Sequence, residues 1–195
     1  YRAVSILNNF AKLLEIILYN RIYLSTKNHI SIHQHGFMMQ RSTVTNLMVF
    51  NQYLCESLDN RGQVDVVYTD FSKAFDKVSR CILLRKLKHL GFNDSYLALL
   101  KSYLTSRQQY VFYTGYSSHV DTSTSGVPQG SNLGPLLFIL FVNDLCDSLT
   151  CFKLMFADDL KFYSTISCLE DCIAIQEQIN ILQMYCSNSQ ISLTD

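Results

Sequence analysis

The sequence lacks an excess of charge of either sign, a long apolar run, a paired-cysteine motif and more than a few proline and glycine residues. Its 195 residues include 2 Pro and 7 Gly against 48% apolar residues, which indicates a packed globular chain rather than a disordered one. The longest apolar run, 135–142, is far shorter than the roughly 20 residues of a membrane span. No secretory signal is visible. We therefore expect an intracellular protein, in the nucleus or the cytoplasm, that does not bind a membrane.

Seven cysteines occur without any CxxC pair, which gives no support to a zinc ribbon or a disulfide framework. We expect reduced, mostly buried thiols. Cys168 and Cys172 would share one face of a helix, and we interpret them as core residues. His33 and His35 are separated by one residue, but no cysteine or carboxylate is close to them in sequence. We interpret both as loop histidines and not as metal ligands.

The zero net charge does not match the strongly basic character typical of a nucleic-acid-binding domain. The charges are nevertheless unevenly distributed. Up to residue 120 the chain has 14 Lys and Arg against 7 Asp and Glu, and from there onward it has 2 against 9. A basic first part and an acidic second part can place polyanion and cation sites on different faces.

The apolar pattern predicts an α+β fold, because helical and strand segments are mixed without a βαβ rhythm. In the first predicted helix, 4–20, one stripe contains Leu7, Phe10, Leu13 or Leu14, and Ile17. The other expected segments are helices at 43–58, 79–91, 93–107, 135–149 and 167–190, a buried strand at 64–71, a hairpin around Thr114 and Gly115, and short strands at 151–156 and 160–165.

Two adjacent carboxylates, Asp158 and Asp159, interrupt the apolar segment LMFADDLKFY. A turn between two strands can expose both charges while their flanks stay buried, but the carboxylates then repel each other. A divalent cation such as Mg²⁺ or Mn²⁺ offsets that repulsion directly. The alternative is an ordinary β-turn, in which Asp is common.

A third carboxylate, Asp70, ends the strand-like segment VDVVYTDF. If the two strands are neighbours in one sheet, their acids meet. Three acids can hold two metal ions about 4 Å apart, which is the geometry that stabilises the attacking and leaving oxygens in phosphoryl transfer. The alternative is that Asp70 merely caps the next turn.

The residues after Asp70 form a short loop whose backbone amides can cradle a triphosphate: Phe71, Ser72, Lys73, Ala74 and Phe75. If Phe75 faces the site, its ring is a flat wall that would exclude a ribose 2′-hydroxyl. The alternative is a core phenylalanine.

Another loop, GVPQGSNLGP, precedes a predicted helix. Gly126, Gly130 and Gly134 allow close backbone approach, and Gln129 offers an amide to a base or sugar. The order of the segments, with this loop between the lone acid and the acid pair, makes the pattern specific.

Together these segments resemble the reverse transcriptases of non-LTR (LINE-type, jockey-like) retrotransposons. The matching segments are YRAVSILNNFAKLLEIILYNRI, DFSKAFDKV (motif A), GVPQGSNLGPLLFILFVNDL (motif B) and FADDLKFY (motif C). The resemblance implies a right-hand polymerase with a fingers-like helical segment, 1–62, and a palm, 63–195. The palm is expected to have an antiparallel sheet packed on helices, without a thumb.

The resemblance also implies an RNA-directed DNA polymerase that adds deoxynucleotides (dNTPs) to a primer 3′-hydroxyl on an RNA or DNA template. In this interpretation Asp70, Asp158 and Asp159 are catalytic and hold two Mg²⁺ ions, or Mn²⁺ in their place, with help from the Phe71 carbonyl. Phe75 matches the family's steric gate for deoxynucleotides.

The resemblance assigns Gln129 and Gly130 to the nucleotide and template contact, and Arg41 to the triphosphate. The fingers segment GFMMQRST departs from the family pattern at two positions. Met38 stands where the family has arginine, and Gln40 where it has glycine. The fingers segment therefore lacks one positively charged side chain that would contact the incoming nucleotide.

Tyr185 stands where the family usually has tryptophan, and the chain stops before the family's next lysine motif. The Met38 and Gln40 departures and the truncation favour an alternative, a catalytically inactive retroelement remnant that at most binds nucleic acid or metal; the three intact acids and Phe75 oppose it. An RNA-directed RNA polymerase is a third hypothesis, which the bulk of Phe75 opposes. We expect the isolated chain to synthesise weakly or not at all, and nothing in the sequence indicates an oligomeric state.

Overall fold

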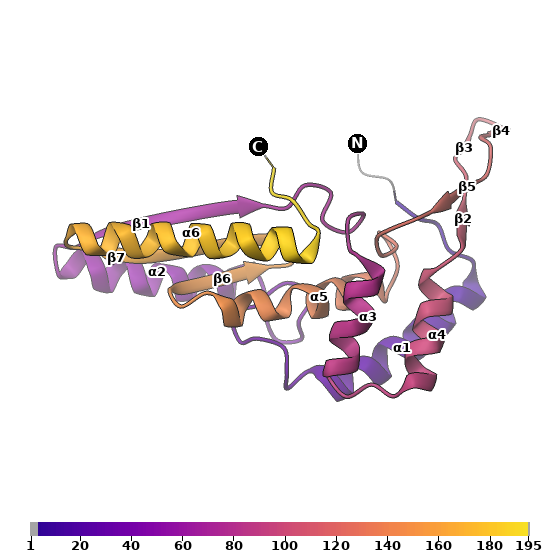
Figure 1. Ribbon diagram of the computed structural model, residues 1–195, viewed down its shortest axis with the longest axis horizontal. Helices are drawn as coiled ribbons and strands as arrows, with labels where there is room; N and C mark the ends of the chain where they lie inside the picture. The colour runs from indigo at the N-terminus through magenta and orange to yellow at the C-terminus, as the bar shows by residue number, and fades with distance from the viewer. Residues whose placement is uncertain (1–3, 195) are drawn as a thin grey trace.

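The computed structural model describes residues 4–194, and in it a three-stranded antiparallel sheet lies between helices (Figure 1). The ends of the predicted fingers and palm segments, 1–3 and 195, lie outside the described residues. The helices are α1 (Asn9–Thr26), α2 (Thr43–Asp59), α3 (Arg80–His89), α4 (Asp94–Leu104), α5 (Gly134–Ser148) and α6 (Leu169–Ser189). The strands are β1 (Gln63–Asp70), β2 (Arg107–Gln109), β3 (Phe112–Tyr113), β4 (Tyr116–Ser117), β5 (Asp121–Ser123), β6 (Phe152–Phe156) and β7 (Asp159–Ile166).

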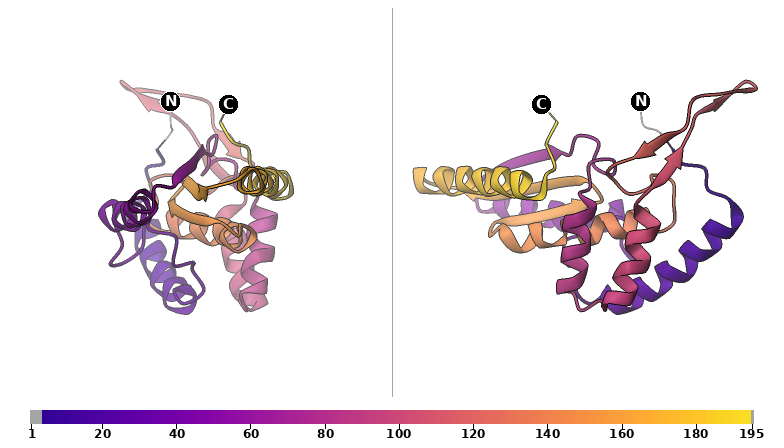
Figure 2. Two further views of the ribbon diagram at one scale, coloured as in Figure 1. Left: turned by 90° about the vertical axis from the view of Figure 1, so that its left-hand side faces the viewer. Right: turned by 45° about the vertical axis from the view of Figure 1, so that its right-hand side comes forward.

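The strand order of the sheet is β1-β7-β6, and the predicted α+β fold with an antiparallel sheet packed on helices is confirmed. Helix α2 lies against one face, and α5 and α6 lie on the other (Figure 2). Successive side chains of β7 point to opposite faces of the sheet, as the two-residue period of a strand requires. Tyr163 packs with Phe50 of α2, whereas Leu160 and Phe162 join the main core.

The main core also contains Leu18 and Ile22 of α1, so the predicted division at residue 62 does not separate two independent cores. The division into fingers, 1–62, and palm, 63–195, stays a prediction about the functions of these two segments. Within residues 4–194, no helix is long and apolar enough to cross a membrane.

Strand β1 was expected to be buried, but all of its residues are half-buried or exposed. The reason is its position at an edge of the sheet. Tyr68 is 68% exposed there. Beyond β1, Phe71 forms an antiparallel bridge with Leu193, so the end of this edge is covered by the residues that follow α6.

The predicted apolar stripe of the first helix is exposed at Phe10, Leu13, Leu14 and Ile17. The structure buries a different face of α1, which includes Glu15, Leu18, Ile22 and Thr26. Apolar residues surround this helix almost completely. Periodicity therefore could not select the face that packs.

The expectation of mostly buried thiols is wrong. Cys146 and Cys186 are buried and Cys151 is half-buried, but four cysteines are exposed: Cys55, Cys81, Cys168 and Cys172. Cys168 is the N-cap of α6. The helix contributes Leu182, Tyr185 and Cys186 to the core, and Ile175 and Ile179 pack against it, whereas Cys172 in the first turn is exposed.

Tyr185, where the resemblance leads to an expected tryptophan, takes part in a polar network with residues of α3 and α5. Its hydroxyl donates to Asp144 Oδ1 over 2.7 Å and accepts from Lys86 Nζ over 2.9 Å. Lys86 Nζ also donates to Asp144 Oδ1, at 2.7 Å, and to the Phe141 carbonyl, at 2.6 Å. Burial raises the pKa of Tyr185, and the negative charge of Asp144 raises it further. The tyrosine thus keeps the bulk of an aromatic residue, and its hydroxyl accepts a hydrogen bond from the largely buried ammonium group of Lys86.

Tyr185→Phe removes one hydroxyl from this network and leaves Lys86 paired with Asp144. We expect the free energy of unfolding to fall by about 1–2 kcal/mol, because the lost hydrogen bonds connect the hydroxyl to charged groups. Urea denaturation at pH 7 measures this change. Tyr116→Phe is the matched control, since Tyr116 is 80% exposed, and should leave the midpoint unchanged. Equal midpoints for the two variants would contradict the assigned role.

Candidate active site

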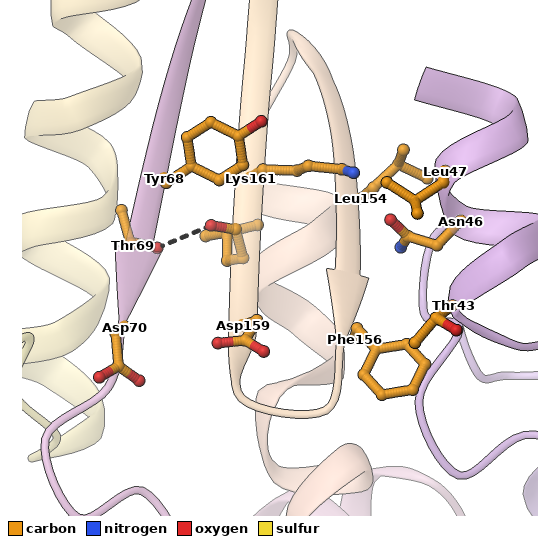
Figure 3. Close-up of a pocket in the computed structure, with 11 residues that line it drawn as sticks. Thr43, Asn46, Leu47, Tyr68, Thr69, Asp70, Leu154, Phe156, Asp159 and Lys161 are labelled. Atoms are coloured by element: carbon orange, nitrogen blue, oxygen red, sulfur yellow. Dashed lines mark hydrogen bonds between the residues drawn. The ribbon is translucent and has the colours of Figure 1, made fainter. Parts of the chain in front are cut away.

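The three predicted catalytic acids lie at one end of the sheet. Strands β1 and β7 are antiparallel neighbours, and their register places Asp70 directly opposite Asp159. The condition for the acids to meet, that the two strands are neighbours in one sheet, is therefore met. Both residues line a cavity of about 450 Å³ between α2 and the sheet (Figure 3).

The backbone of Asp70 turns away from β7. Its carbonyl accepts a hydrogen bond from the Thr194 amide over 2.8 Å, on the far side of β1. In an antiparallel pair, residues whose backbone groups face away from each other have the closer side chains, with Cα atoms about 4.5 Å apart. The register thus brings the Asp70 and Asp159 side chains together by the shorter of the two pairing geometries.

Asp158 lies in the two-residue turn between β6 and β7, after Ala157. Ala157 has a φ of 57°, a conformation that is costly for a residue with a Cβ. The buried side chain of Gln34 holds this turn. Gln34 Oε1 accepts from the Ala157 amide at 2.9 Å, and its Nε2 donates to the Ala157 carbonyl at 3.3 Å. The sequence did not single out Gln34.

The loop around Gln34 is joined to β6 through backbone groups. The His35 amide donates to the Met155 carbonyl at 2.8 Å, and the Met155 amide donates to the His33 carbonyl at 2.9 Å. At Gly36 a Cβ atom would lie 2.2 Å from the Ala157 nitrogen, so backbone touches backbone there. A segment from the predicted fingers therefore fixes the turn that carries Asp158.

The basic residues of this loop have partners within the protein. Arg41 Nη1 donates to the carbonyls of Ser31, at 2.8 Å, and Gln34, at 2.6 Å. His35 Nδ1 lies 2.8 Å from Thr45 Oγ1. Burial lowers the pKa of His35, followed by the positive charge of Arg41, which favours the neutral ring.

The loop after Asp70 packs against the glycine loop of motif B. The Phe75 ring is half-buried and stacks on Phe138 of α5, with ring centroids 4.7 Å apart. The Phe75 carbonyl accepts from the Val127 amide at 2.9 Å. At Gly126, a Cβ would lie 2.6 Å from the Asp76 carbonyl oxygen, which explains the need for glycine.

Two charged residues that the sequence did not single out hold the glycine loop. The buried Arg80 donates to the carbonyls of Gly126, at 3.0 Å, and Ser125, at 2.6 Å. Glu15 of α1 is 0% exposed, accepts from the Tyr103 hydroxyl, and accepts from the Asn132 amide at 2.8 Å. Neither contact has a sequence signature, because each joins segments far apart in the chain.

The predicted nucleotide contacts of motif B lie just before Asn132. The Gln129 carbonyl accepts from the Ser5 amide at 2.8 Å, and its side chain is half-buried. Gly130 has a φ of 90°, which a residue with a side chain rarely adopts. Among residues 4–194, no group of three or more His, Cys, Asp or Glu side chains is arranged to hold a metal ion.

Comparison with known proteins identifies the class to which this fold and site belong. A family model described as reverse transcriptase (RNA-dependent DNA polymerase) matches residues 1–195. The chain belongs to the reverse transcriptase family.

Curated relatives specify the branch. The chain is 32% identical over 197 residues to the probable RNA-directed DNA polymerase from transposon BS of Drosophila melanogaster, covering 95% of this chain and 22% of the relative. It is 30% identical to the RNA-directed DNA polymerase from mobile element jockey of the same species, covering 99% and 22%. The predicted resemblance to non-LTR retrotransposons is confirmed, and the chain spans about a fifth of the length of these relatives.

Solved structures show the same fold at low identity. Telomerase from Candida albicans, in complex with a fragment of telomeric RNA, matches with a TM-score of 0.60 and 13% identity, covering 95% of this chain and 35% of that chain. Apo telomerase from Candida tropicalis matches with a TM-score of 0.53 and 15% identity, covering 94% and 40%.

Gln34→Ala tests whether this glutamine holds the turn of Asp158. The change leaves the buried amides of Gly36 and Ala157 without their acceptor, and each unsatisfied group costs about 1–3 kcal/mol. We expect a loss of at least about 2 kcal/mol in the free energy of unfolding, measured by urea denaturation. The control Gln183→Ala changes an exposed glutamine of α6. A Gln34→Ala midpoint equal to that of the control would refute the role.

Proposed function

We propose that this chain is the nucleotidyl-transfer part of an RNA-directed DNA polymerase, which adds deoxynucleotides to a primer 3′-hydroxyl on an RNA or DNA template. The observation that carries the proposal is the register of the acids: Asp70 lies opposite Asp159, and Asp158 is adjacent, in a chain of the reverse transcriptase family. In this proposal 1–62 acts as fingers and 63–195 as palm, inside the cell.

The donor set fits a divalent cation. Asp70, Asp158 and Asp159 supply hard carboxylate oxygens at one end of the sheet, which are the ligands that Mg²⁺ prefers, with Mn²⁺ as a substitute. The carboxylates do not form a three-ligand group as they stand, so in this proposal binding two ions draws them together. When bound, such ions lower the pKa of the primer hydroxyl and neutralise the triphosphate.

The Phe71 carbonyl is a further proposed ligand. Phe71 faces Leu193 in an antiparallel bridge whose hydrogen bonds are made by the flanking residues, from the Ser72 amide to Ser192 and from the Thr194 amide to Asp70. In such a bridge the backbone groups of the central residue face the opposite side. This geometry supports a Phe71 carbonyl directed toward β7 and its acids.

The loop between Phe71 and Phe75 is proposed to bind the nucleotide. The Ser72 amide already donates to the Ser192 carbonyl, so Lys73, Ala74 and Phe75 would supply the amides of a triphosphate cradle. The stacking of Phe75 on Phe138 supports a steric gate, because a ring held in place cannot yield to a 2′-hydroxyl.

The remaining contacts to substrates come from the fingers and motif B. Arg41, whose Nη1 holds its own loop, would offer its other guanidinium nitrogens to the triphosphate. Gln129 and Gly130 would contact the nucleotide and template. The names of the relatives, and the RNA bound in the Candida albicans telomerase structure, support a nucleic-acid template as the partner.

A second candidate is the inactive remnant, and one observation favours it. Gln40, at the position of the family's glycine, has a φ of 64°, and Met38, at the position of the family's arginine, is buried. A side chain at a left-handed position stores strain. Gln40 thus adds backbone strain to the fingers loop, and Met38 does not supply the positive charge of the missing arginine.

Single-nucleotide incorporation on a primed RNA template with Mg²⁺ tests the function. We expect the wild-type chain to extend the primer by one deoxynucleotide, and Asp158→Asn to lower the rate at least about 100-fold, the loss typical for one group that stabilises a transition state. Asp147→Asn, at an exposed position of α5, should leave the rate unchanged. A folded wild-type chain without any incorporation would favour the remnant.

Phe75→Val tests the steric gate. The smaller side chain should raise the kcat/KM for ribonucleotides relative to deoxynucleotides about 10-fold or more, because the wall against the 2′-hydroxyl is removed. The control Phe112→Val changes a ring that is 66% exposed on a distant hairpin. An unchanged preference in both variants would mean that Phe75 serves only as a packing residue.

A further inference from the structure

The four residues after Gln190 lie beside the end of β1, next to the candidate active site, and form one isolated bridge there. Gln190 adopts the left-handed conformation, with φ of 57° and ψ of 36°, and ends α6. The chain then reverses and runs beside the end of β1 (Figure 1). We call residues 191–194 the edge segment.

The edge segment is held at successive positions. Ile191 is 7% exposed and belongs to the main core. The Ser192 carbonyl accepts from the Ser72 amide at 2.8 Å, and the Ser192 hydroxyl accepts from Lys77 Nζ at 2.5 Å. The segment is thus fixed on the core before it reaches Asp70.

At Asp70 the edge segment presents a threonine. The Thr194 amide donates to the Asp70 carbonyl at 2.8 Å. Thr194 Oγ1 lies 3.1 Å from Asp70 Oδ2 and 3.2 Å from the Asp70 carbonyl oxygen. A hydroxyl has one proton to donate. Because the amide already satisfies the carbonyl, the charged carboxylate is the stronger acceptor for that proton.

We infer that Thr194 is a positioning residue for the Asp70 carboxylate, and this inference rests on the proposed function. Among the residues that the structure describes, Thr194 is the one side chain that donates to this carboxylate. The bond ties one oxygen to the outer side of β1, while the other points toward Asp159 (Figure 3). The carboxylate is thereby held ready for a cation.

The hydroxyl acts against electrostatic repulsion. Asp70 lies opposite Asp159, and the repulsion between like charges favours a rotation of the Asp70 side chain away from Asp159. A carboxylate held by a hydrogen bond loses less conformational freedom when a cation binds. Outer-shell hydrogen bonds of this kind typically change metal affinity about 10- to 100-fold when removed.

Mn²⁺ titration of the 195-residue chain, followed by the electron paramagnetic resonance signal of the free ion, tests the inference. We expect Thr194→Val to weaken Mn²⁺ binding about 10-fold, while Thr194→Ser, which keeps the hydroxyl, binds like wild type. Thr150→Val is the matched control, since it removes an exposed hydroxyl at the opposite end of the sheet. Thermal midpoints of all three variants should stay near that of wild type, because both threonines are exposed.

The outcomes separate this inference from the proposed function. If wild type binds Mn²⁺, Asp70→Asn abolishes that binding and Thr194→Val binds like wild type, the inference is wrong and the proposed function stands. If Thr194→Ser is weakened as much as Thr194→Val, packing and not the hydroxyl is responsible, and the inference is also wrong. If wild type binds no Mn²⁺, or Asp70→Asn binds equally well, the cation site itself is wrong and the inference fails with it.

Discussion

Electrostatic repulsion among three carboxylates at one end of a small sheet is the constraint on which the rest of the structure depends. Asp70 and Asp159 are paired by the register of β1 and β7, and Asp158 occupies the adjoining turn. A side chain alone could rotate to relieve this repulsion, but the backbone cannot, because the pairing of the two strands fixes it. The sheet therefore maintains a local concentration of negative charge, which a bound cation would offset.

The elements around the sheet serve to hold this arrangement from several sides. Gln34 brings a loop from the predicted fingers against the turn of Asp158, and Thr194 brings the edge segment against Asp70. Arg80 and Glu15 hold the glycine loop, which in turn packs on the loop of Phe75. Segments from the beginning, middle and end of the chain thus converge on a site that local sequence alone does not build.

The candidate site residues have a local sequence signature and the residues that support them do not, for a physical reason. The acids interrupt apolar strands, and that conflict is visible locally, as is the turn at Gly115. Gln34 and Thr194 are ordinary polar residues whose partners lie 123 and 124 positions away, so no local pattern distinguishes them. The packing face of α1 was also beyond prediction, because apolar residues surround the helix.

The most direct test of the account is the position of the cation relative to the acids. A crystal structure of the chain soaked with Mn²⁺ would locate the ion from its anomalous scattering. We expect an ion bound by oxygens of Asp70 and Asp158 at about 2.1 Å, the distance typical of a small divalent cation. Well-ordered carboxylates with no ion between them at saturating Mn²⁺ would contradict it, and would favour a fold that keeps the reverse transcriptase motifs without the site.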